Sequence, residues 1–171
     1  SVVNVTNPSF PIEEFFISDL NSTWRDIKTW GNYAYVTTEA NAGLLIVDLT
    51  DMTGNTYWHV TQFTNSNTGA SVTFTSAHNL YIDENGVCYI FGAGSNSGSN
   101  PSDGVIFLDV DANPTSPVYL GDWDDEYIHD GVRYGDHITN LIRQGESDGL
   151  LGIAFPALSG KNITDAKVLE K

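Results

Sequence analysis

The chain has 171 residues, 40% of them hydrophobic, which is typical of one folded domain and excludes wholesale disorder. Seven Lys and Arg residues stand against 22 Asp and Glu residues, so the formal net charge is −15. That charge has the wrong sign for nucleic acid or an anionic membrane surface. No apolar run approaches the roughly 18 residues that cross a bilayer, so we expect no direct membrane insertion. Cys88 is the single cysteine, which excludes an internal disulfide and a CxxC metal pair.

Short apolar segments between Gly, Asn, Asp and Pro turns follow one another along the chain, a pattern typical of β-strands. The clearest predicted strands are residues 32–37, 44–49, 80–82, 87–91 and 105–110. Residues 162–171 are the one stretch expected to form a short helix. The sequence therefore predicts an all-β fold.

Two sequence signals alternate at a period of about 50 residues. One is a hydrophobic strand that ends in Asp or Asn before a turn, found at residues 2–8, 45–51 and 107–114. The other is a polar pair that opens a strand. The three pairs are Arg25-Asp26, His78-Asn79 and His129-Asp130. A period of this length, filled with about four short strands, is typical of a β-propeller blade.

We expect a single partial propeller domain with repeats near residues 1–23, 24–75, 76–126 and 127–171. Propellers typically contain four to eight blades, and these repeats supply about three. The sequence thus predicts either a fragment of a longer protein or a ring that a partner chain completes. The alternative fold is a small β-sandwich with accidental internal similarity.

The motifs resemble a known family. Residues 44–48 (LLIVD) are close to the signature of LVIVD-repeat proteins, whose repeats form β-propellers. Residues 23–28 (TWRDIK) and 31–36 (GNYAYV), with 76–79 (SAHN) and 127–130 (YIHD), resemble the choice-of-anchor B subgroup of that family. The resemblance implies a secreted or surface-attached protein with a variable anchoring device and no established catalytic activity.

Equivalent positions in successive blades point toward the same part of the propeller axis, so the three polar pairs are expected to converge at the channel mouth. Imidazole favours zinc-like metals and carboxylate oxygen favours calcium. The candidate ligands of a divalent cation are His78, His129, Asp130, Asp26 and His137. The competing interpretation is a purely structural ring of hydrogen bonds, in which Asp accepts backbone N–H groups and Arg25 pairs with an Asp.

Three functions stay open at this point. The leading hypothesis is a non-catalytic binding or assembly scaffold, extracellular or at the cell surface, whose partner is a protein or the remaining blades. The second is a metal-dependent hydrolase or lyase with its site at the channel. The third is a subunit of a larger extracellular complex.

Overall fold

The computed structural model describes residues 1–94, 104–123, 127–134, 137–144, 147–154 and 167–170, and from residue 134 onward only the backbone course. Every regular element in the described residues is a β-strand, so the all-β prediction is confirmed. The strands are β1 (Val2–Asn4), β2 (Ile12–Phe15), β3 (Arg25–Trp30), β4 (Tyr33–Thr38), β5 (Leu44–Asp48), β6 (Tyr57–Val60), β7 (Gln62–Thr64), β8 (Ser71–Thr73), β9 (Asn79–Ile82), β10 (Val87–Phe91), β11 (Val105–Asp109), β12 (Val118–Trp123), β13 (Asp130–Tyr134), β14 (His137–Gln144), β15 (Ser147–Ala154) and β16 (Lys167–Glu170).

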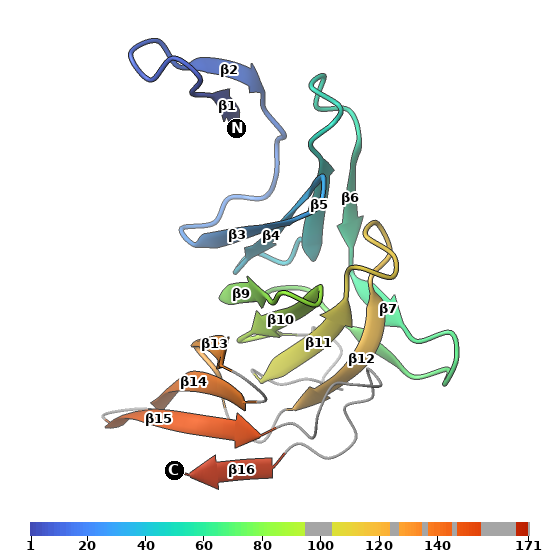
Figure 1. The fold of residues 1–171 in the computed structure, drawn as a ribbon, viewed down its shortest axis with the longest axis vertical. Helices are drawn as coiled ribbons and strands as arrows, with labels where there is room; N and C mark the ends of the chain where they lie inside the picture. Colours follow the sequence, from blue (N-terminus) through green and yellow to red (C-terminus); the bar gives the residue numbers. More distant parts are fainter. Residues whose placement is uncertain (95–103, 124–126, 135–136, 145–146, 155–166, 171) are drawn as a thin grey trace.

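The strands form antiparallel sheets that succeed one another down the view in Figure 1. β1 and β2 make a two-stranded sheet, followed by three four-stranded units, β3-β4-β5-β6, β9-β10-β11-β12 and β13-β14-β15-β16, the middle one being part of the six-stranded sheet β8-β7-β12-β11-β10-β9. The hairpin β7–β8 extends the middle one through a single parallel pair, Val118 with Thr64. None of these sheets closes on itself within the described residues. The same residues contain no helix that could span a membrane.

The short helix expected at residues 162–171 is wrong where the structure describes this segment. Residues 167–170 form β16, the edge strand of the last sheet, and Val168 pairs with Ile153. Four residues gain little from a helical turn, because helix nucleation is costly. Pairing with an existing strand supplies the backbone hydrogen bonds instead.

The strand register repeats between the two four-stranded sheets β3–β6 and β9–β12. In each, the Asp that ends the third strand pairs with the first residue of the second strand. Four residues further along, that second strand pairs with the polar residue near the start of the first strand. The pairs are Tyr33–Asp48 and Thr37–Asp26 in one sheet, and Val87–Asp109 and Phe91–Asn79 in the other. Asp26 and Asn79 therefore hold equivalent positions.

Strands β5, β10 and β11 are buried on both faces, which explains why they are continuous apolar runs and not alternating ones. The two faces of each strand belong to different cores. Between sheets β3–β6 and β9–β12 lies a cluster that includes Tyr35, Leu44, Ile46, Cys88, Ile90, Ile106 and Leu108. The other face of sheet β9–β12 contributes Val87, Tyr89, Phe91, Val105 and Phe107 to a second cluster, which Ile128 joins. Sheet β9–β12 is thus packed on both faces, as a propeller blade is.

A third, smaller cluster lies on the outer face of sheet β3–β6. Phe15 of β2 packs there with Leu45 and Val47 of β5. The turn after β5 must also be free of a side chain, because a Cβ at Gly54, whose φ is +70°, would lie 2.6 Å from the Phe15 ring. The hairpin β1–β2 therefore packs on the first four-stranded sheet from the side opposite the main core.

Candidate functional site

The first strands of the three four-stranded sheets meet in succession, since β3 contacts β9 and β9 contacts β13. His78 directly precedes β9, and His129 directly precedes β13. The ring centroids of these two imidazoles are 3.9 Å apart, with the planes at 45°. The structure thus brings together the two histidines that the 51-residue spacing placed at equivalent positions.

Two further aromatic rings surround this pair. The indole of Trp24 stacks on His78 with centroids 4.7 Å apart and planes at 10°. Tyr127 meets His129 edge to face at 6.3 Å. Because Trp24 precedes β3, the cluster joins three successive sheets at the ends of their first strands.

Glu39, one residue beyond β4, contacts this cluster. Its Oε1 lies 2.8 Å from Nδ1 of His78. The His78 residue is 9% exposed, whereas the Glu39 side chain is 48% exposed. Nε2 of His78 is fully buried and has no hydrogen-bonding partner among the described residues. Sequence reasoning missed Glu39, since it belongs to neither repeated signal.

Asp26 makes a structural contact between sheet β3–β6 and sheet β9–β12. Its Oδ2 accepts the backbone N–H of Leu80 in β9 at 3.3 Å and lies 2.5 Å from Nζ of Lys28. A carboxylate that holds the neighbouring sheet in this way matches the structural interpretation of the polar pairs.

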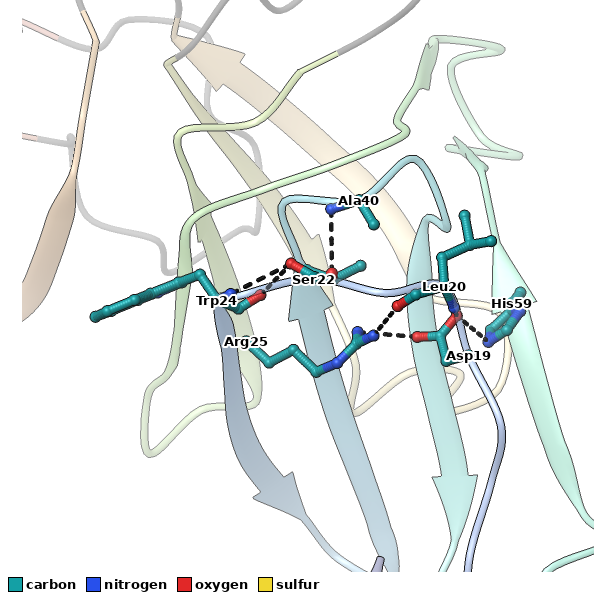
Figure 2. Close-up of polar contacts among 8 residues, drawn as sticks. Asp19, Leu20, Ser22, Trp24, Arg25, Ala40 and His59 are labelled. Carbon is teal, nitrogen blue, oxygen red and sulfur yellow. Dashed lines mark hydrogen bonds and ion pairs between the residues drawn. The ribbon is translucent and has the colours of Figure 1, made fainter.

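Arg25, the partner of Asp26 in the sequence, anchors the segment between β2 and β3 (Figure 2). Its guanidinium donates to Oδ2 of Asp19 at 3.0 Å and to the carbonyl of Leu20. Asp19 also lies 3.8 Å from Nε2 of His59 in β6, and its side chain is only 10% exposed. Arg25 therefore holds this segment across the end of sheet β3–β6, while Trp24 extends away from it.

Two other predicted ligands, Asp130 and His137, lie on the hairpin β13–β14. Asp130 Oδ1 accepts the N–H of Gly131 at 2.7 Å. His137 pairs with Tyr134, whereas Asp130 pairs with Leu141, so the hairpin β13–β14 places His137 at the opposite end of β13 from His129. The side chain of His137 lies outside the described residues.

A buried ionic network links the β9–β10 turn to β13. Asp83 Oδ2 lies 2.6 Å from Nη1 of Arg133 and accepts the hydroxyl of Tyr89 at 2.9 Å. Its Oδ1 accepts the N–H groups of Asn85 and Val87, both at 2.9 Å. Burial, and then the charge of Asp83, raises the pKa of Tyr89 well above its ordinary value. The network joins the second and third four-stranded sheets.

Cys88 carries no reactive chemistry in the folded chain. Its side chain lies in the main core and is fully buried. Burial raises the pKa of its thiol well above the ordinary range, so the thiolate does not form near neutral pH. Cys88 therefore packs as a small hydrophobic side chain.

An apolar groove of about 520 Å³ runs between the hairpin β1–β2 and the outer face of sheet β3–β6. Eight of the large hydrophobic side chains exposed to solvent belong to this hairpin, the segment after it or β3. They are Val3, Val5, Phe10, Ile12, Phe16, Leu20, Trp24 and Ile27. Of these, Phe16, Leu20 and Ile27 line the groove, and exposed apolar surface of this kind marks interaction sites on folded proteins.

No three His, Cys, Asp or Glu side chains gather as a ready ligand set in the part of the chain that the structure describes. The metal inferred from the polar pairs thus stays a prediction. The geometry does establish that the imidazoles of His78 and His129 are in contact and that the carboxylate of Glu39 orients His78.

The stacked four-stranded sheets and their repeated register define a propeller-like scaffold. Residues 23–54 match the family model of the LVIVD repeat, so the chain contains an LVIVD repeat, centred on β3, β4 and β5. LVIVD repeats form β-propellers. No curated protein and no solved structure matches the chain.

Proposed function

We propose that this chain is a non-catalytic scaffold module that binds further β-strands at the free edge of β1, beside the apolar groove. The observation that carries the proposal is the groove beside the hairpin β1–β2. Sheet β1–β2 has two strands, whereas each following sheet contains at least four. By the repeat, β1 corresponds to β5, which pairs on both edges, with β4 and with β6. In the described residues β1 pairs with β2 alone.

The occupant proposed for the groove is a β-hairpin of the same repeat type. Its backbone would pair with the open edge of β1, as strands add to exposed sheet edges in other proteins. Its apolar side chains would cover Ile27 and Phe16, which line the groove and are 57% and 64% exposed. Fully burying a side chain of this size contributes about 1.5–3 kcal/mol.

The resemblance beyond the matched repeat supports the finer part of this proposal. Residues 76–79 and 127–130, which follow the choice-of-anchor B pattern, supply the two clustered histidines. We therefore place the protein in that subgroup, outside the cell or at its surface, with a divalent cation at the channel mouth. Partners are then other extracellular chains or further blades of the same protein.

Analytical ultracentrifugation tests whether the groove and the free edge of β1 bind a second copy of the chain. We expect the chain to self-associate at tens of micromolar in salt high enough to screen its charge of −15. The double variant Ile27→Asp, Phe16→Asp should associate at least tenfold more weakly, because it replaces apolar contacts with charges. Met52→Asp is the matched control, since Met52 is 55% exposed and does not line the groove.

The proposal fails if the parent chain stays monomeric under these conditions. It also fails if the Met52 variant weakens association as much as the double variant does, because the groove would then have no special part in the contact.

A further inference from the structure

We propose that His78 and His129 bind a divalent transition-metal ion through their ring nitrogens, with Glu39 as the residue that positions His78. The inference deepens the channel-mouth cation of the proposed function. It replaces the five ligands expected from the sequence with two imidazoles and an orienting carboxylate.

The contact between Glu39 and His78 determines which nitrogen of His78 carries the proton. A carboxylate oxygen 2.8 Å from Nδ1 accepts a hydrogen bond, so Nδ1 is the donor. In the neutral ring the lone pair then lies on Nε2. Histidines that bind metals almost always donate their other ring N–H to a carboxylate, carbonyl or water in this way. Glu39 thus prepares Nε2 of His78 as a ligand.

The other ring nitrogen of His78, Nε2, makes no hydrogen bond that stabilises the described fold. It is fully buried, and no described residue hydrogen-bonds to it. Buried polar atoms in native proteins are nearly always paired, and an exception calls for a function or a bound species. A bound ion would satisfy Nε2 of His78.

His129 is the second nitrogen donor, since its ring is in contact with that of His78. The two rings meet partly face to face, at 45°. Coordination requires the His129 ring to turn until a nitrogen, in place of the ring face, is directed at the ion. Water molecules would complete the coordination, because zinc sites outside purely structural centres keep positions for water.

The donor atoms favour a transition metal over calcium. Imidazole suits zinc, copper and nickel, whereas Ca²⁺ takes six to eight oxygen ligands. One oxygen of each predicted carboxylate has a structural contact, since Asp26 Oδ2 holds Leu80 and Lys28 and Asp130 Oδ1 accepts the N–H of Gly131. A net charge of −15 raises the local concentration of any cation.

Isothermal titration of the full chain with ZnCl₂ and, separately, CaCl₂ tests the proposal. We expect one Zn²⁺ per chain and no saturable Ca²⁺ binding at the same concentrations. His78→Asn and His129→Asn should each weaken Zn²⁺ binding at least 100-fold. His59→Asn is the control, since His59 also lies beside a carboxylate, that of Asp19, but is an exposed residue of β6, outside the imidazole pair.

Glu39→Gln separates an orienting role from a structural one. Losing such an outer carboxylate typically weakens metal binding 10–100-fold while both ligands remain. Glu84→Gln, on another exposed glutamate, should leave the affinity unchanged. The visible absorption of bound Co²⁺ gives a second readout in the parent chain and in Glu39→Gln, should a histidine variant fail to fold.

Absence of stoichiometric Zn²⁺ binding overturns the site, and so does an equal loss in His59→Asn. Unchanged affinity in Glu39→Gln overturns the role of Glu39. The groove variants Ile27→Asp and Phe16→Asp should still bind Zn²⁺, so failure of the metal site and failure of the scaffold give different results.

Discussion

Asp83→Asn tests the buried network between the second and third four-stranded sheets. The Asp83 side chain is fully buried and that of Arg133 is 11% exposed. The substitution keeps the size and an oxygen for the N–H groups of Asn85 and Val87, but it removes the charge that faces Arg133. Breaking a buried ion pair by removing one partner costs about 3–5 kcal/mol, since the other charge stays buried.

For a chain of this length each kcal/mol shifts the melting temperature by about 2–4 °C. We therefore expect the melting temperature of Asp83→Asn to fall by about 6–20 °C, followed by circular dichroism near 215 nm, with a matching loss in urea. Glu84→Gln is the control, because Glu84 contacts the same Arg133 nitrogen at 3.3 Å while its side chain is 74% exposed. An exposed pair contributes less than about 1 kcal/mol.

The reasoning is refuted if both variants lose similar stability. It is refuted equally if Asp83→Asn melts within about 2 °C of the parent chain, since the carboxylate would then carry no charge-dependent part of the contact between the sheets.

Two further predictions concern the turns and the buried phenols. Gly86→Ala should cost about 2–4 kcal/mol in urea unfolding, because φ is +72° and the new Cβ would lie 2.6 Å from Cβ of Asp111; Gly69→Ala, at φ +75° with nothing within 4 Å, should cost only the backbone strain. Burial raises the pKa values of Tyr35 and Tyr89. Their contribution is therefore present below the unfolded pKa of about 10 and is lost as the pH rises above it. The urea midpoint should fall between pH 8 and pH 11, and this fall should be shallower in the double variant Tyr35→Phe, Tyr89→Phe. A midpoint that is level across this range would contradict the burial argument.

Apolar runs between turn residues were sufficient to predict β4, β5, β9, β10 and β11. The repeat was sufficient to predict that His78 and His129 meet, because equivalent positions of stacked repeats gather at one place. Continuous apolar runs such as residues 87–91 predicted strands that are buried on both faces, and the structure has them as β10.

The contacts that single side chains make between sheets could not be predicted from the sequence. Glu39 reaches His78 only because the end of β4 lies beside the start of β9, a relation that no local pattern records. Asp26 is held by the N–H of Leu80 for the same reason. The strand at residues 167–170 exists because β15 offers it an edge, so tertiary pairing overrides a weak local preference.

The separation of the apolar residues into distinct clusters, one for each pair of adjacent sheets, has a consequence for how the molecule comes apart. In such linear stacks stability is a sum over nearest-neighbour contacts, so loosening can begin at a terminal layer without disturbing the middle. Hydrogen exchange should accordingly be slowest in β5, β10 and β11, which contribute side chains to two clusters each, and fastest in the β1–β2 layer, which contributes to one.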